Sequence, residues 1–228
     1  MQRLSVIGEF RVGEWSKDIP RGCFVNRDQA IVEICTGKTV LHVGAADAPF
    51  DLDKGRTGQL LHQKVQSVAK LVVGVDIDSE AISSLKTIGI EDIVEADICE
   101  SDPLPGANFD VILCCDVIEH VPAPGLLLAA CRRYMRTDSK LVVTTINATA
   151  LKPALRAFAN KEAVHHDHVA YYSFATLGKL MVMANLKPVE FGVFAYPTVN
   201  RLVGWVTTLM MYSAPATADG IIINAKLA

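Results

Sequence analysis

The chain lacks a long hydrophobic run, a block of basic residues and any cysteine pair spaced as Cys-x-x-Cys. Its longest apolar stretch, residues 202–212, is too short to cross a bilayer, so no transmembrane segment is expected. Lys and Arg number 22 against 25 Asp and Glu, which leaves a net charge of −3. Surfaces that bind polymeric nucleic acid are built from clustered basic residues, so we expect no nucleic-acid partner.

The six cysteines and the first residues indicate the compartment. Most of the cysteines lie in apolar segments, which is typical of buried free thiols in a reducing compartment; zinc or disulfides are the alternative. Charged residues interrupt the amino-terminal segment, so it does not resemble a signal peptide. We therefore predict a cytoplasmic protein.

Strand-like and helix-like segments alternate along the chain. Runs rich in β-branched residues are expected to form strands over 39–43, 71–75, 90–96, 109–115, 141–146, 189–196 and 220–225. Helices are expected over 27–35, 58–70, 80–88, 125–135, 173–184 and around 201–212, with Asn26, Ser79 and Ser173 at the starts of three of them. This alternation predicts an α/β fold with a mainly parallel sheet and helices on both faces. We expect a single domain over 1–228, with a lead-in and cap helix over 1–38 and a core over 39–228.

Acidic residues stand at the ends of successive predicted strands. Asp76, Asp97 and Asp116 each follow an apolar strand, and Gly44 ends the first one. Ligands of open α/β sheets bind at the carboxyl ends of the strands, so this order predicts a nucleotide-type cofactor site. Each acid taken alone could equally cap a turn or a helix, because Asp favours both.

This order of motifs resembles that of the class I S-adenosylmethionine-dependent methyltransferases. The resemblance spans about 40–224 and implies a Rossmann-like sheet of seven strands, helices on both faces and an antiparallel last strand. It implies S-adenosyl-L-methionine as cofactor. The family's glycine-rich loop corresponds to the run from His42 to Ala48, where Gly44 remains, Ala45 and Ala46 replace glycines, and Asp47 follows. His42 replaces the usual acid of that motif.

The resemblance also assigns roles to the strand-end acids. It implies that Asp76, with Ile77 after it, accepts hydrogen bonds from the two ribose hydroxyls. A carboxylate suits a vicinal diol because its two oxygens meet two donors. It implies that Asp97 and Ile98 hold the adenine, and that Asp116 lies at the methionine end of the cofactor.

A nicotinamide-binding Rossmann domain is the fold most easily confused with this one. That domain has Gly-x-Gly-x-x-Gly, with the ribose acid about twenty residues further on. Here the glycines do not have that spacing, and the stretch between Gly44 and the ribose acid, Asp76, is longer than in a nicotinamide-binding domain. A dehydrogenase is therefore a poor fit. The runs Leu-His-Gln-Lys over 61–64 and His-His-Asp-His-Val over 165–169 resemble a narrower methyltransferase subgroup associated with polysaccharide and other glycan biosynthesis.

Histidines supply the candidate base. Methyl transfer to a hydroxyl requires removal of its proton, and an imidazole suits that task near neutral pH. His168 is the first choice as catalytic base, with His165 and His120 as alternatives. A solvent-exposed loop would explain the 165–168 cluster as simply, and a packing role would explain His120. The cluster could also ligate Zn²⁺ or Fe²⁺ together with Asp167, but no metal site is predicted. His62 is expected on the surface of its helix.

Together these features predict a methyltransferase that acts on a small-molecule or glycan-like acceptor, at oxygen rather than at carbon or nitrogen. The alternative is a catalytically silent cofactor- or partner-binding module on the same fold, because fold alone does not settle function. The sequence leaves open which acceptor is used and whether the chain forms a homodimer.

Overall fold

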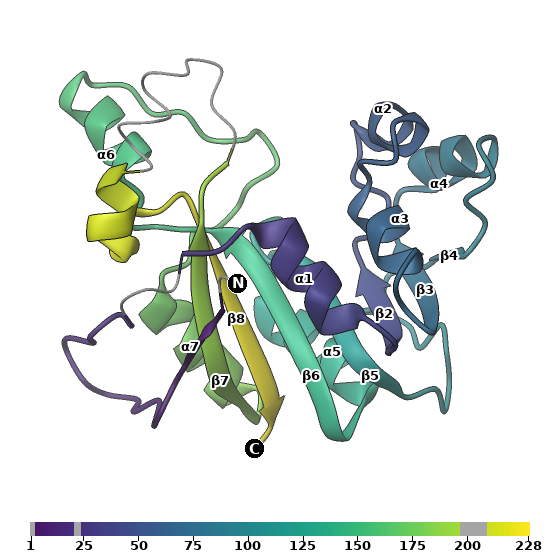
Figure 1. The fold of residues 1–228 in the computed structure, drawn as a ribbon, viewed down its shortest axis with the longest axis horizontal. Coiled ribbons are helices and arrows are strands. Elements are labelled where there is room, and N and C mark those ends of the chain that lie inside the picture. The colour runs from purple at the N-terminus through teal and green to yellow at the C-terminus, as the bar shows by residue number, and fades with distance from the viewer. Residues whose placement is uncertain (1–2, 21–23, 197–208) are drawn as a thin grey trace.

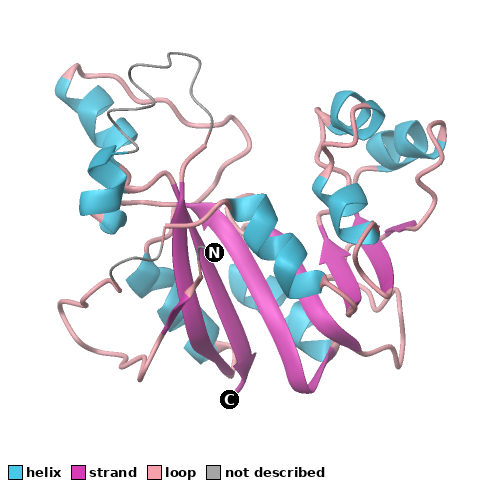
Figure 2. Ribbon diagram, in the orientation of Figure 1, coloured by secondary structure: helices cyan, strands magenta, loops and turns pink. Residues whose placement is uncertain are grey.

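The computed structural model describes residues 3–20, 24–196 and 209–228. One sheet of eight strands runs through these residues in the order β1-β7-β8-β6-β5-β2-β3-β4 (Figures 1 and 2). The strands are β1 Ser5–Val6, β2 Thr39–Val43, β3 Leu71–Asp76, β4 Ile93–Glu95, β5 Phe109–Cys115, β6 Met135–Ile146, β7 Leu186–Phe194 and β8 Gly220–Leu227. The helices are α1 Arg27–Cys35, α2 Asp51–Arg56, α3 Leu61–Gln66, α4 Ser79–Lys86, α5 Pro124–Arg133, α6 Leu151–Phe158 and α7 Phe174–Met183.

The direction of the strands confirms the predicted Rossmann-like fold. Strands β6, β5, β2, β3 and β4 are parallel to one another, whereas β8 is antiparallel to both β6 and β7. The sheet differs from the expected seven strands by one. Ser5 and Val6, in the segment read as a loop-rich lead-in, pair with the edge strand β7 as β1. A two-residue edge strand has too short a pattern to be recognised from sequence.

Helices cover the two faces of the sheet as predicted. α5 and α7 pack in the largest hydrophobic cluster on one face, and α1 and α3 pack in a second cluster on the other. α4 packs in a third cluster near β4. At the carboxyl ends of the parallel strands, α6 and the helical residues 209–213 lie on one side, and α2 and α4 lie on the other (Figure 1).

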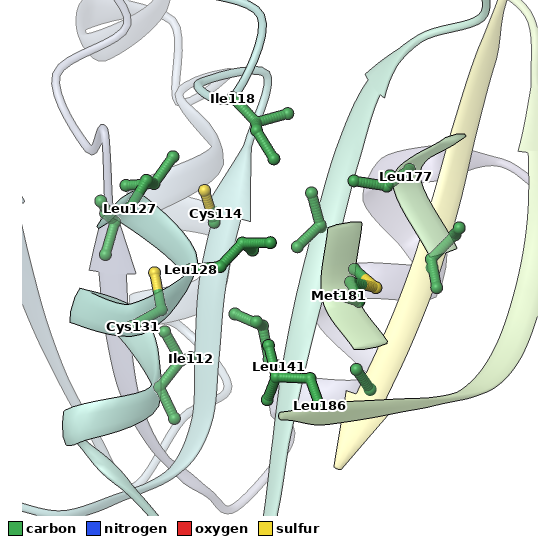
Figure 3. Packing of buried hydrophobic residues seen from close by; sticks show 14 of the residues in the cluster. Ile112, Cys114, Ile118, Leu127, Leu128, Cys131, Leu141, Leu177, Met181 and Leu186 are labelled. Atoms are coloured by element: carbon green, nitrogen blue, oxygen red, sulfur yellow. The ribbon is translucent and has the colours of Figure 1, made fainter. Parts of the chain in front are cut away.

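The largest cluster joins the sheet to α5 and α7 through aliphatic and sulfur-containing side chains (Figure 3). Among them are Cys114 of β5 and Cys131 of α5, both fully buried. Within the described ranges the cysteines are free thiols, as expected: Cys35, Cys114, Cys115 and Cys131 are buried, and Cys99 is partly buried. Cys23 lies outside the described residues.

Several helix boundaries differ from those that the sequence predicts. Of the helix expected over 58–70, only Leu61–Gln66 is helical, as α3; the sequence did not predict α2, which ends at Arg56 just before Gly58 at φ +67°. Asp78, and not Ser79, caps α4, since its Oδ1 accepts a hydrogen bond from the Ala81 N–H at 2.9 Å. Asn26 caps α1 as predicted, by accepting from the Gln29 N–H.

The strand boundaries also shift, and one helix is described only in part. β6 starts six residues earlier than predicted, and β4 shrinks to three residues. Most of the apolar helix expected around 201–212 lies outside the described residues. In the part of the chain that the structure describes, no helix is both long enough and apolar enough to span a membrane.

Candidate functional site

The loops after β2 and β5 touch at the centre of the carboxyl edge of the sheet. β2 lies between β5 and β3, so the chain switches direction across the sheet at this point, which is where open α/β folds bind ligands. Gly44 in the first loop has φ +73°, and a Cβ built on it would lie 2.3 Å from Cγ2 of Val117 in the second. Both the backbone angle and the contact therefore require glycine at position 44.

The carboxylate of Asp76 ties the first loop to the end of β3. Its Oδ2 accepts the Ala46 N–H at 2.8 Å, and its Oδ1 accepts the Asp78 N–H at 3.0 Å. A carboxylate offers about four acceptor directions. Each oxygen therefore keeps the capacity to accept one further donor, which is what a vicinal diol requires.

Asp97 and Ile98 follow β4, which is the neighbour of β3. The registers place Asp76 opposite Glu95, so both strands end at the same edge. Asp97 is exposed, and its Oδ1 accepts the Cys99 N–H at 2.7 Å, while Ile98 is buried in the core. Ile77 is 72% exposed directly after Asp76. An exposed apolar side chain beside carboxylates suits a ligand that is both flat and polar, such as a nucleoside.

Asp116, after β5, is held by two donors from elements far apart in the sequence. Arg27 of α1 donates to its Oδ2 at 2.7 Å, and the Thr144 hydroxyl of β6 donates to its Oδ1 at 2.9 Å. The backbone of Asp116 is left-handed, with φ +54°. Burial alone would lower the pKa of Arg27, but the charge of Asp116 and its other neighbours raise it well above the usual value. The guanidinium of Arg27 therefore stays protonated.

The remaining loop residues have mainly structural contacts. Ala45 and Ala46 are buried against the cluster that contains α4. Asp47, at φ +62°, accepts a hydrogen bond from Lys54 of α2 at 2.6 Å. Burial raises the pKa of Asp47, and Lys54 opposes that shift. The side chain of Asp47 thus already has a cationic partner.

A buried imidazole pair lies next to the same loop. Nδ1 of His42 is 3.2 Å from Nδ1 of His62, and Nε2 of His62 is 3.2 Å from Oδ1 of Asp92. Burial, with a contribution from His62, holds the pKa of His42 well below its usual value. A Cβ on Gly74 would meet both Ala45 and His62, so the pair packs against the loop. The prediction that His62 lies on the surface is wrong: it is fully buried, because its helix turns it toward His42.

The three histidines predicted as catalytic lie together on the same edge. The loop after β5 meets the connection between α6 and α7, since the Val169 N–H donates to the backbone carbonyl of Glu119 at 2.8 Å. The ring of His120 is 4.6 Å from that of His168 and 5.8 Å from that of His165, measured between centroids. His165 is exposed, whereas His120 and His168 are partly buried.

Burial and neighbouring groups favour the neutral form of two of these imidazoles, His120 and His168. Burial lowers the pKa of His120 and of His168, and the neighbouring imidazoles of the cluster lower it further. The charge of Asp116 acts on both in the opposite direction. The cluster therefore lies within the field of the acid that ends β5.

Glu119, between Asp116 and the histidines, is 1% exposed. Burial raises its pKa to about 7, and the charge of Asp116 adds to that rise. Neither of its carboxylate oxygens has a geometrically acceptable hydrogen bond within the described ranges, although Thr145 lies near enough to lower the pKa. Glu119 can therefore exchange a proton near neutral pH.

Two cavities of the described structure lie outside this constellation. The larger, of about 730 Å³, is at the amino ends of the parallel strands, where Lys38, Asp110 and Lys140 are among its lining residues. The smaller, of about 360 Å³, lies between α6 and residues 209–217 and is mostly apolar. Strand-end acids line neither, so we place the candidate site by its side chains and by the topology of the sheet.

Sequence reasoning missed three partners of the site: Arg27, Thr144 and Asp92. Arg27 lies in a helix that the sequence does predict, but no local pattern links it to Asp116, 89 positions away. Thr144 and Asp92 both read as residues of predicted strands. Only the fold brings them to the edge.

Comparisons with known proteins also indicate a methyltransferase. A family model described as a methyltransferase domain matches residues 52–143. A ubiquinone biosynthesis O-methyltransferase from Thiobacillus denitrificans is 26% identical over 166 residues, covering 66% of this chain and 70% of the relative. A SAM-dependent methyltransferase from Archaeoglobus fulgidus superposes with a TM-score of 0.59 at 20% identity, covering 88% of this chain and 91% of the other. Magnesium protoporphyrin IX methyltransferase from Synechocystis PCC 6803, solved with bound SAH, superposes with a TM-score of 0.58 at 14% identity, covering 89% and 82%.

Proposed function

We propose that this chain, a class I S-adenosylmethionine-dependent methyltransferase, transfers a methyl group to an oxygen atom of a small hydroxylated acceptor. One observation carries the proposal. The loops after β2 and β5, the carboxylate of Asp76 and an imidazole cluster all lie at one switch point of the sheet. A donor site and a proton acceptor are what methyl transfer to oxygen requires.

The residues present fit the cofactor. S-adenosyl-L-methionine, when bound, supplies a methyl group already activated on a sulfonium. The spare acceptor capacity of Asp76 matches two ribose hydroxyls, and exposed Ile77 offers an apolar wall for the adenine. Exposed Asp97 can accept the adenine amino group, with Ile98 buried behind it.

Arg27 and Asp116 supply opposite charges for the amino-acid end of the cofactor. The two side chains are 2.7 Å apart and partly buried. The methionine moiety carries one carboxylate and one ammonium, so a guanidinium beside a carboxylate is complementary to it. In this assignment Arg27 joins the cofactor site, and Asp116 keeps the role that the resemblance implies.

The imidazole cluster takes the proton of the acceptor hydroxyl. His168 is our first choice as base, with His165 and His120 as alternatives. The contacts that lower the pKa of His168 keep its ring neutral at neutral pH, with a lone pair available. A positioned base contributes about 10²–10⁴-fold to the rate. His168→Ala should therefore lower turnover by about that factor while cofactor binding survives. A variant that keeps most of its rate would contradict the assignment.

The relatives bear on the class of acceptor. Sequence relatives such as the one from Thiobacillus denitrificans carry the name ubiquinone biosynthesis O-methyltransferase, which favours a ubiquinone precursor over a saccharide as acceptor. The narrower likeness to the glycan subgroup finds no support among them. We therefore propose a ubiquinone-precursor-like acceptor for this chain, and keep saccharides in the assay panel.

Calorimetry tests the cofactor part of the proposal. We expect micromolar affinity for S-adenosylhomocysteine and none for nicotinamide dinucleotides. Binding of NAD without binding of S-adenosylhomocysteine would contradict it. The silent-module alternative gains weight from Ala45 and Ala46, which fill positions where the family has glycine.

A further inference from the structure

Three imidazoles from two separate loops converge beside Asp116. His120 comes from the loop after β5, and His165 and His168 come from the connection between α6 and α7. One ligand atom from each lies within 4.8 Å of the other two. The sequence grouped His165, His166 and His168, whereas the structure replaces His166 with His120. We propose that His120, His165 and His168 bind one divalent transition-metal ion of the zinc class.

One ring nitrogen of the trio is buried without a partner within the described ranges. Nδ1 of His168 is out of contact with solvent and has no hydrogen-bond partner among the residues that the structure describes. A buried polar atom without a partner costs free energy, which a bound ion would recover.

To bind one ion, the three ligand atoms must move slightly closer together, and the ion would keep one coordination position free. Zinc–nitrogen bonds of about 2.0–2.1 Å in a tetrahedron separate the nitrogens by roughly 3.4 Å. The atoms must therefore approach one another by up to about 1.4 Å, from 4.8 Å at most. His165 is exposed on its loop and can rotate to do this. Three protein ligands with an open fourth position are typical of catalytic rather than structural zinc.

The open position gives the metal a role in the proposed reaction, and only this step rests on that proposal. The acceptor's hydroxyl oxygen occupies the open position, and its O–H bond breaks as the proton passes to water. The O–CH₃ bond then forms as the S–CH₃ bond breaks, which leaves S-adenosylhomocysteine. In the metal-free protein His168 takes the same proton, so ion and base are two ways to ionise one hydroxyl.

The test measures metal binding without cofactor or acceptor. Chelator-treated full-length protein is titrated with Co²⁺, followed by its visible absorption, and with Zn²⁺ in competition. We expect one ion per chain and tetrahedral cobalt bands. His120→Ala and His168→Ala should each weaken binding by at least roughly a hundredfold. His165→Ala should do the same, and because His165 is exposed this variant should fold normally.

His166→Ala is the matched control, because His166 is adjacent and exposed but outside the trio. A second group, His165, His166 and Asp167, also has its ligand atoms within 4.8 Å of one another, and all three are exposed. Binding that is lost in His166→Ala but kept in His120→Ala would assign the ion to that surface group and overturn the proposal. Binding no tighter than millimolar in the wild type would also overturn it.

Catechol tests the open position separately. Its oxygens should shift the cobalt bands of the loaded protein in the absence of cofactor. Bands that form but do not respond to catechol would contradict the open position. Failure of metal binding in a protein that still binds S-adenosylhomocysteine would reject the metal site and leave the proposed methyl transfer standing.

Discussion

Asp76→Ala perturbs the cofactor site and the loop around it at once. The substitution removes the two oxygens that accept the Ala46 and Asp78 N–H groups at 2.8 and 3.0 Å. In the proposed complex the same oxygens accept the two ribose hydroxyls. Two separate losses are therefore expected, one in the stability of the cofactor-free protein and one in cofactor affinity.

The contacts set the size of each loss. A hydrogen bond to a charged group contributes about 1.5–3 kcal/mol. Asp76 is partly exposed, so water replaces some of that contribution, and we expect a total loss of about 1–3 kcal/mol in the free energy of unfolding. For a chain of this size that lowers Tm by about 3–10 °C. Loss of the ribose contacts should weaken S-adenosylhomocysteine binding about ten- to a hundredfold. The sequence alone suggests little change in Tm, because it does not reveal the two loop contacts.

Thermal melting and calorimetry with S-adenosylhomocysteine measure the two losses on the same samples. Asp76→Asn, which keeps one acceptor oxygen, should fall between the wild type and Asp76→Ala. Glu80→Ala, which removes an exposed acid in the first turn of α4, should leave both quantities within about 0.5 kcal/mol of wild type. Unchanged affinity in Asp76→Ala would place the ribose elsewhere, and an unchanged Tm would refute the role of the carboxylate in holding the loop.

Substitutions at three other positions, Gly44, Arg27 and His42, test the edge of the sheet. Gly44→Ala should lower the free energy of unfolding by about 1–2 kcal/mol because of the left-handed backbone alone, and by more because of the clash with Val117. Adding Val117→Ala should restore part of that stability. An unchanged Tm in Gly44→Ala would contradict the packing. Arg27→Met leaves Asp116 without its cation, so it should lower the free energy of unfolding by about 1–3 kcal/mol and also weaken cofactor binding. Wild-type cofactor affinity in this variant would show that Arg27 is not part of the cofactor site. Below pH 6.5 the unfolded chain protonates His42 while the folded chain does not, so stability should fall by up to about 1.4 kcal/mol per pH unit for this group. Denaturant titrations should show a flatter acid limb in His42→Asn, and an unchanged slope would mean that another group controls it.

The parts of the fold that local patterns encode could be predicted. β2, β3 and β5 are short apolar runs that end in glycine or aspartate, so their ends and their shared edge could be read directly. Asn26 and Ser173 mark helix starts because their side chains accept hydrogen bonds from the first turn. The order of these signals also pointed to the family.

The missing parts depend on contacts between distant elements. Arg27 and Asp116 meet only because α1 packs over the sheet, and His120 joins His165 and His168 only because two loops share a backbone hydrogen bond. His62 was misjudged because a six-residue helix gives too few positions to show which side is buried. Asp78, and not Ser79, is the N-cap of α4 because the helix starts one residue earlier than the sequence pattern suggests.

Turnover of labelled cofactor tests the central claim most directly. The protein is incubated with S-adenosylmethionine carrying a deuterated methyl group and a panel of phenols, catechols and saccharides, and the products are identified by mass spectrometry. We predict a deuterated methyl ether on a small hydroxylated ring and stoichiometric S-adenosylhomocysteine. Tight binding of S-adenosylhomocysteine with no transfer to any acceptor in the panel would contradict this account and favour a silent cofactor-binding module.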